Sequence, residues 1–225
     1  GRAGRRGMDH IGFAVAVPGR FMDLGHVARL VSSPPSDVAS QIRINFSMVL
    51  NLLLSHAPRQ VEELLKRSFA TFQLIQSLGP RASRRSLETS HRHLYEDFER
   101  HLDFLVAHGY AEADGRLTAD GVWASQLRVD QPLLIAEGFR RQAFPEHDPA
   151  LLAGIVAAFV NEDETDDALG RKMVPRPLAQ AYNRVRKRLV TFARDMHAGG
   201  FPVRPLHLRP AATLYHWASG LEWEQ

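Results

Sequence analysis

The sequence predicts a mainly α-helical protein with a short strand near its N-terminus. Apolar residues recur at intervals of three and four in several long segments, which is the spacing of an amphipathic helix. A short apolar run near the N-terminus is closed by Pro18-Gly19 and fits a buried strand. A third stretch alternates around an Asp-Gly pair, which is typical of a β-hairpin.

The composition excludes several classes of protein. Without any cysteine the chain has no disulfide, no catalytic thiol and no cysteine-bound zinc. Its longest apolar runs are shorter than the roughly 20 residues that a membrane-spanning helix needs, and no signal-peptide pattern is present. We therefore expect a cytoplasmic protein without a membrane partner. A net charge of +3 over 225 residues is compatible with nucleic-acid binding but does not require it.

The first seven residues, GRAGRRG, form a candidate phosphate-binding motif. Arg2 and Arg5 are three positions apart, so they lie on one side of a helical turn, and the glycines around them add little bulk. Guanidinium groups can grip phosphate oxygens with two hydrogen bonds each. The alternative is a basic, glycine-rich tail.

The next segments predict one strand and two helices. Residues 12–17 are expected to be an edge strand of a sheet, and the Ser-Ser-Pro-Pro break at 32–35 begins new architecture. A helix is predicted over 37–55, ended by Pro58, and a second over 60–73. The second helix should bury a face that its apolar residues define: Val61, Leu64, Leu65, Phe69 and Phe72. Residues 79–86 are predicted to be a flexible basic linker.

A helix over 93–108, a hairpin over 109–118 and a helix ending at Leu127 follow. Asp114-Gly115 is predicted to form the tip of a two-stranded wing. Helix, wing and helix together are winged-helix organisation. We expect residues 37–73 and 93–127 to pack together as one domain despite the linker.

From Pro132 onward the sequence predicts only helices. Asp148 is a good N-cap before Pro149, and residues 161–167 form an acidic loop that lacks calcium-loop spacing. A long helix over 177–197, ended by Gly199-Gly200, should bury one apolar face. Its outward face carries candidate nucleic-acid contacts, namely Arg184, Lys187 and Arg188. The alternative is an ordinary solvent-exposed face whose arginine stems cover apolar surface.

Two further groups of residues are not expected to form ligand sites. The spacing of His91, His93, His101 and His108 does not bring them together on one helix face, so no metal site is predicted. The three tryptophans are expected to pack in the core or between domains instead of stacking on bases: Trp123, Trp217 and Trp223.

The opening GRAGRRG resembles motif VI of superfamily-two helicases, in the form typical of DExH-box RNA helicases of the superkiller and exosome-cofactor type. Other sequence motifs of the family follow along the chain in the same order as in the family. The stretch NFSMVLNLL at 45–53 and the SFATFQ at 68–73 are similar to its first winged-helix segment, with matches at Asn51, Ser68 and Gln73. The segment YHWASG at 215–220 resembles the Tyr-x-Trp-x-x-Gly of its DSH C-terminal (DSHCT) helical domain.

This resemblance implies the end of a RecA-like domain followed by a winged helix and a helical-bundle domain. Residues 1–31 would be the tail of the second RecA-like helicase domain, with motif VI and its last strand. Residues 32–127 would be the winged-helix domain, with a short linker at 76–91 in place of the arch insertion of eukaryotic relatives. Residues 128–225 would be part of the DSHCT domain, ending before the helix that lines the family's RNA channel.

The resemblance also implies an activity. The full-length enzyme would hydrolyse ATP with Mg²⁺, move 3′ to 5′ along single-stranded RNA and unwind RNA duplexes that have an overhang. Arg2 and Arg5 would contact the ATP phosphates, one of them as an arginine finger. The sequence contains no Gly-x-x-x-x-Gly-Lys-Ser/Thr loop and no DExH motif, so we expect this fragment alone to bind no cofactor and to be inactive. Its partners would be RNA and the missing N-terminal RecA-like domains of the same chain.

Two other functions are compatible with parts of the sequence. A winged-helix regulator that binds nucleic acid would explain the hairpin and its flanking helices. Such a protein would not explain the opening GRAGRRG motif. A DNA helicase of related build would explain the motif equally well, because the sequence does not distinguish RNA from DNA.

Overall fold

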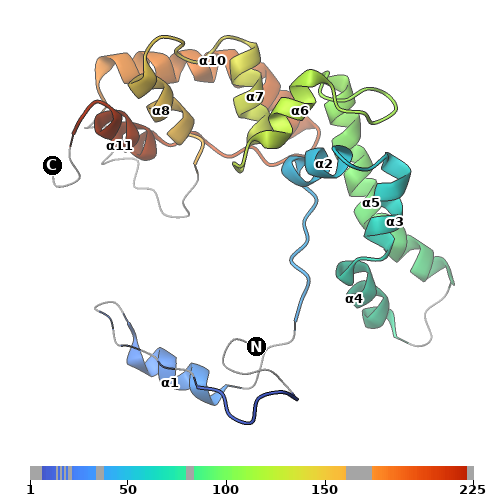
Figure 1. The fold of residues 1–225 in the computed structure, drawn as a ribbon. Coiled ribbons are helices and arrows are strands. Elements are labelled where there is room, and N and C mark those ends of the chain that lie inside the picture. The colour runs from blue at the N-terminus through green and yellow to red at the C-terminus, as the bar shows by residue number, and fades with distance from the viewer. Residues whose placement is uncertain are drawn as a thin grey trace. The chain divides into compact units, whose positions relative to one another are not determined.

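The computed structural model describes residues 7–221 except for 14, 16, 18, 20, 21, 34–37, 80–83 and 161–173. Nothing is described of the side chains of residues 32 and 84–91. The chain divides into two compact units, Gly1–Ala39 and Ser40–Gln225. Figure 1 shows that the described regular structure is helical in both units.

The first unit contains helix α1, Leu24–Ser32, which the sequence analysis missed. Asp23 caps it, because its carboxylate accepts hydrogen bonds from the backbone N–H groups of Gly25 and His26 at 2.8 and 3.1 Å. Asp23, followed by apolar residues three and four positions apart, is a pattern that predicts the start of an amphipathic helix. Several apolar side chains of the helix are exposed, among them Leu24 and Val31.

The strand predicted over 12–17 is not present in the described residues of that stretch. Phe13, Val15 and Val17 are 82, 84 and 73% exposed and have no regular structure. A β-strand is stabilised by hydrogen bonds to a neighbouring strand, and the described residues supply no neighbour. The RecA-like assignment of this unit stays a prediction.

The two helices predicted at the start of the second unit are three shorter ones: α2 (Phe46–Leu53), α3 (Pro58–Lys66) and α4 (Phe69–Leu78). Helix α2 begins late because Asn45 caps it, accepting from the Met48 N–H at 2.9 Å. Ser68 caps α4 in the same way and so divides the segment predicted as one helix.

The prediction that Phe69 and Phe72 face the core is wrong. These rings stack on each other with centroids 6.0 Å apart and are 47 and 53% exposed. The turn before Ser68 reorients α4, so its apolar stripe does not continue that of α3. On α3, Val61 and Leu65 are buried as predicted, whereas Leu64 is 44% exposed.

Helix α5 runs from Arg84 to Ala107 and is much longer than the predicted helix over 93–108. The linker predicted over 76–91 is therefore too long, since α4 continues to Leu78 and α5 already begins at Arg84. Both α3 and α4 pack against α5, and α2 packs against α5 and α6. Segments on the two sides of the linker thus lie together, as predicted (Figure 1).

The predicted hairpin is present as a single antiparallel bridge between Ala111 and Leu117. Its turn is closed by the Glu112 N–H, which donates to the Arg116 carbonyl at 2.8 Å. Gly115 lies in this turn with a φ of +87°. The flanking strands are too short to form a sheet, so the winged-helix assignment stays a prediction.

Helix α6 (Ala119–Gln126) follows the hairpin and packs against α7 (Pro132–Arg140). The remaining helices are α8 (Pro149–Ala157), α10 (Arg176–Ala198) and α11 (Leu208–Ala218). Asp148 caps α8 and Gly199 ends α10, both as predicted. Helix α10 packs against α7 and α8, while α8 lies along α11 (Figure 1). No described helix combines the length and the apolar character needed to cross a bilayer.

An aromatic cluster joins these helices into one core. Phe46 of α2 lies 5.3 Å from Phe104 of α5 and 4.7 Å from Phe201, measured between ring centroids. Phe104 also contacts Phe192 of α10 at 5.7 Å. Among the described residues from 40 onward this core includes residues on both sides of position 127, where the sequence predicts a domain boundary, and that boundary stays a prediction.

Three polar residues that match the helicase family hold the second unit together. Besides the Ser68 cap, the Gln73 side chain accepts a hydrogen bond from the Ser40 N–H at 2.7 Å. The side-chain oxygen of Asn51 accepts one from Arg128 at 3.2 Å. Each of these three residues therefore forms a hydrogen bond within the second unit.

Gly115→Ala should lower the free energy of unfolding by about 1–3 kcal/mol, because a positive φ disfavours alanine and its Cβ would lie 2.5 Å from Cγ of Pro58. The matched control is Gly79→Ala, where φ is +74° but no atom lies within 4 Å of the added Cβ. Urea unfolding of both variants measures the difference. Equal losses would show that the hairpin turn does not pack on α3.

Candidate nucleic-acid interface

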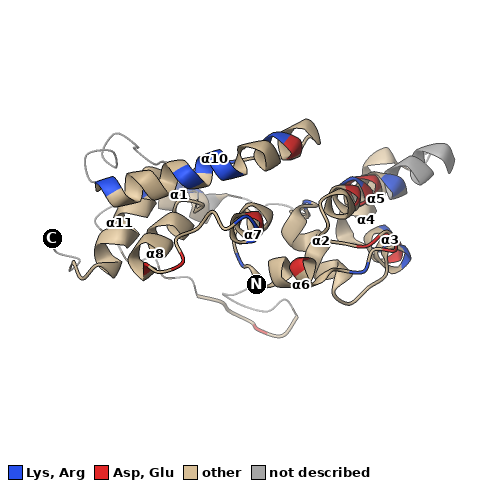
Figure 2. Ribbon diagram, turned by 90° about the horizontal axis from the view of Figure 1, so that it is seen from above, with Lys and Arg blue, Asp and Glu red and all other residues tan. Residues whose placement is uncertain are grey.

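Helix α10 presents a strongly basic face to solvent. Its apolar positions are buried as predicted: Leu178, Val185, Leu189, Phe192 and Met196. Tyr182 is half-buried, and its hydroxyl donates to the Leu206 carbonyl at 2.7 Å. The remaining face carries most of the helix's Arg and Lys residues, with Asp195 as its acidic residue (Figure 2).

The three predicted nucleic-acid contacts have different environments. Arg184 and Lys187 are exposed, and none of the described carboxylates forms an ion pair with them. Arg188 is already engaged, because its Nη1 donates to the Arg141 carbonyl at 3.1 Å. Arg141 returns the contact, donating from Nη1 to the Arg188 carbonyl at 3.2 Å. The structure thus leaves Arg184 and Lys187 available for phosphate and gives Arg188 a structural role.

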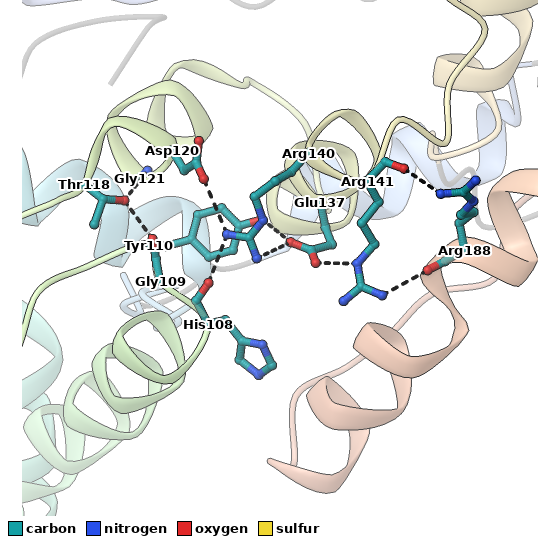
Figure 3. A network of polar contacts seen from close by, with 10 residues as sticks. All are labelled: His108, Gly109, Tyr110, Thr118, Asp120, Gly121, Glu137, Arg140, Arg141 and Arg188. Atoms are coloured by element: carbon teal, nitrogen blue, oxygen red, sulfur yellow. Dashed lines mark hydrogen bonds and ion pairs between the residues drawn. The ribbon is translucent and has the colours of Figure 1, made fainter.

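Arg141 contacts both Arg188 of α10 and a buried carboxylate, that of Glu137 (Figure 3). Glu137 of α7 has a side chain only 2% exposed, and Arg141 Nε lies 2.5 Å from its Oε1. Arg140 Nη2 lies 2.7 Å from its Oε2, which also accepts from the Tyr110 hydroxyl at 2.9 Å. The two guanidinium groups and the hydroxyl replace the water that this carboxylate loses on burial.

The same network fixes the hairpin and α6 against α7. Arg140 lies over the Tyr110 ring at 4.7 Å and donates to the His108 carbonyl at 3.0 Å. It also reaches Asp120 of α6 at 3.5 Å. Burial raises the pKa of the Tyr110 phenol, and the nearby charge of Glu137 raises it further. Tyr110 therefore stays a hydrogen-bond donor at any ordinary pH.

Two of the four histidines within residues 91–108, His101 and His108, act as packing residues, whereas His93 is exposed. His101 is buried with its ring 4.8 Å from Phe46 and 4.6 Å from Phe201. Its Nδ1 lies 2.6 Å from the Asp97 carbonyl. Burial lowers the pKa of His101 and of His108, which favours their neutral forms. Within the part of the chain that the structure describes, no three His, Asp or Glu side chains gather to hold a metal.

Several predicted residues lie outside the described part. These are Arg2 and Arg5, the acidic segment 161–167, Trp223 and the side chain of His91. The other two tryptophans are not core residues, contrary to one of the predicted roles: Trp123 and Trp217 are 40 and 51% exposed. Trp123 contacts Phe139 edge-on at 5.2 Å.

Comparison with known proteins places this architecture in a family. The profile of the DSHCT (NUC185) domain family matches residues 114–225. The chain contains a DSHCT domain. The match begins at Asp114 in the hairpin, ahead of the predicted start at residue 128, and so includes α6, whose packing against α7 the structure shows.

The chain is also similar to individual proteins that are named superkiller proteins or helicases. The chain is 42% identical to superkiller complex protein 2 of Homo sapiens over 73 residues, which is 32% of this chain and 6% of that protein. It is 36% identical to the probable helicase HelY of Mycobacterium tuberculosis over 78 residues, 35% of this chain and 9% of that protein. A longer match, 29% identical over 166 residues, joins it to the antiviral helicase SKI2 of Saccharomyces cerevisiae and covers 69% of this chain and 12% of that protein. The DSHCT region thus spans a small part of the length of these relatives.

Glu137→Leu should lower the free energy of unfolding by about 3–5 kcal/mol, because it leaves two partly buried arginines without their carboxylate. Tyr110→Phe, which removes one hydrogen bond to that carboxylate, should cost about 1.5–3 kcal/mol. Chemical denaturation followed by circular dichroism measures both.

The control for these variants is Asp114→Asn, which weakens the Asp114–Arg116 pair at 2.7 Å. Both side chains of that pair are more than half exposed, so water screens their attraction and this variant should unfold at nearly the same denaturant concentration as the unchanged chain. If Glu137→Leu is as mild as this control, the network does not stabilise the domain.

Proposed function

We propose that this chain is the C-terminal part of an ATP-dependent RNA helicase that translocates on or unwinds RNA. The observation that carries the proposal is the DSHCT match together with relatives that are named helicases in bacteria and yeast and superkiller complex protein 2 in mammals. One plant relative, 35% identical over 96 residues, is named a DExH-box ATP-dependent RNA helicase.

The opening motif supplies the chemistry that this proposal needs. Phosphoryl transfer in such enzymes develops charge on the phosphate oxygens, which Mg²⁺ and arginine side chains stabilise. Arg2 and Arg5 in GRAGRRG would reach the ATP phosphates from the second RecA-like domain, one as an arginine finger. ATP and Mg²⁺ would be held mainly by the preceding RecA-like domains, so the isolated chain would not turn over ATP.

The basic face of α10 would add contacts to the RNA backbone. Arg184 and Lys187 are exposed and have no described carboxylate partner, which leaves their full charge for phosphate. Because the apolar positions of α10 already face the core, a strand could approach this face without unfolding the helix.

In the full-length enzyme, Arg2→Ala or Arg5→Ala should lower RNA-stimulated ATP turnover by about 10³-fold or more, the scale set by arginine fingers. The control is Arg6→Ala, the adjacent arginine of the same motif, which is not assigned to phosphate. A loss below tenfold for both Arg2 and Arg5 would show that the motif is misassigned. Turnover by the isolated chain would contradict the proposed division of labour.

The isolated chain should bind single-stranded RNA weakly, with a dissociation constant of about 10⁻⁴–10⁻⁶ M at physiological salt. Arg184→Ala or Lys187→Ala should reduce the slope of log affinity against log salt by about 0.7 for each phosphate that the variant no longer neutralises. Fluorescence anisotropy at several salt concentrations measures this slope. Arg67→Ala, at an exposed site on the turn between α3 and α4, is the control.

The same titration with duplex DNA separates the proposal from its rival. Nanomolar binding to one DNA sequence that persists at high salt would favour a winged-helix regulator. Unchanged salt slopes in the Arg184 and Lys187 variants would remove α10 from the RNA interface.

A further inference from the structure

A groove of about 550 Å³ lies between α10 and the chain that follows it. One wall is α10, from Tyr182 to Ala193, and the other is the extended segment 203–206. A volume of this size is typical of a site that takes several side chains of a ligand. The helicase proposal does not account for this groove, and of the predicted RNA contacts only Lys187 lines it.

The floor of the groove is apolar and largely aliphatic. Leu134, Phe159 and Leu189 are buried at its base, with exposed fractions of 4% or less. Val190 of α10 also lines the groove and is 51% exposed. Covering this surface would remove apolar area from water and so favour binding.

The rim of the groove is cationic. Arg186 and Lys187 are exposed, and no described carboxylate forms an ion pair with either. Arg204 on the opposite wall is 3.6 Å from Asp130, but both side chains are more than half exposed, so this pair is weak. An occupant that carries carboxylates would therefore meet uncompensated positive charge at the rim.

The floor favours a peptide over nucleic acid. Proteins that hold single-stranded bases stack them on aromatic faces. The groove's lining tyrosine, Tyr182, has its hydroxyl bonded to Leu206, and the Arg186 guanidinium lies over its ring at 6.0 Å. The rest of the exposed floor is aliphatic, which suits leucine or phenylalanine side chains better than bases.

We propose that this groove docks a short segment of a partner protein, with apolar side chains on the floor and flanking Asp or Glu residues at the Arg186, Lys187 and Arg204 rim. The inference does not depend on the helicase activity. Arg184 then lies on an RNA-facing surface outside the groove, Arg186 lies on the protein-docking surface, and Lys187 lies where the two surfaces meet.

The test is fluorescence-anisotropy titration of the whole chain with a labelled synthetic peptide that has leucine and phenylalanine between runs of Asp and Glu. Matched peptides replace the apolar residues by serine, or the carboxylates by amides. The acidic–apolar peptide should bind, and each replacement should weaken binding by about tenfold or more, which corresponds to about 1.4 kcal/mol. Absence of binding, or equal binding of the three peptides, overturns the proposal.

Protein variants separate this groove from the RNA face. Val190→Asp and Arg186→Glu should each weaken peptide binding about tenfold or more, since they remove floor contact and rim charge. Arg184→Glu lies on the same helix outside the groove and should leave peptide binding unchanged while weakening RNA binding. Thermal unfolding of each variant checks that the fold is retained. Loss of peptide binding in Arg184→Glu alone would contradict the site.

A single-stranded RNA of similar length is the competing ligand. If RNA displaces the peptide and Val190→Asp weakens RNA binding as much as peptide binding, the groove belongs to nucleic acid and the proposal is wrong. The chain's own acidic segment is tested by replacing the five carboxylates within residues 162–167 by amides. If the peptide binds only after that change, the occupant is this segment and not a partner.

Discussion

The buried carboxylate of Glu137 determines how the main parts of the second unit meet. A charge with a side chain 2% exposed is stable only when its hydrogen-bonding capacity is satisfied, and two arginines and one tyrosine do this here. Those partners in turn fix other elements, since Arg140 reaches the hairpin and α6 while Arg141 reaches α10. The relative placement of four segments therefore depends on one carboxylate in α7.

The network extends beyond the DSHCT match, which begins inside the hairpin. Residues 114–225 include α6, α7 and α10 but not Tyr110, which completes the shell of Glu137 from just outside the match. The aromatic cluster of Phe46, Phe104 and Phe201 likewise joins elements on both sides of this boundary. Side-chain contacts thus cross the start of the family match. The helices that precede the matched region pack against it and stabilise it.

Sequence reasoning succeeded where a local signal decides the structure. Periodicity and the glycines predicted α10 and its buried face, and an Asp-Pro pair predicted the start of α8. It failed where a single polar residue interrupts a periodic segment, as Ser68 does, or where a strand depends on partners elsewhere, as at residues 12–17. RNA contact by Arg188 stays a prediction, but its bond to Arg141 could not be predicted, because it depends on the approach of another helix. Glu137 was missed altogether, because a lone glutamate in an apolar helix gives no sign of its distant partners.

The continuity of α5 has a mechanical consequence. Its 24 helical residues span about 36 Å, with the aromatic cluster near one end and α3 and α4 alongside the rest. A continuous α-helix of this length bends little. A force on its N-terminal end near Arg84 would therefore rotate the whole helix about the aromatic cluster near Phe104. In a motor protein, such a helix would act as a lever: a displacement at its N-terminal end would exert torque on the helices that meet at the aromatic cluster.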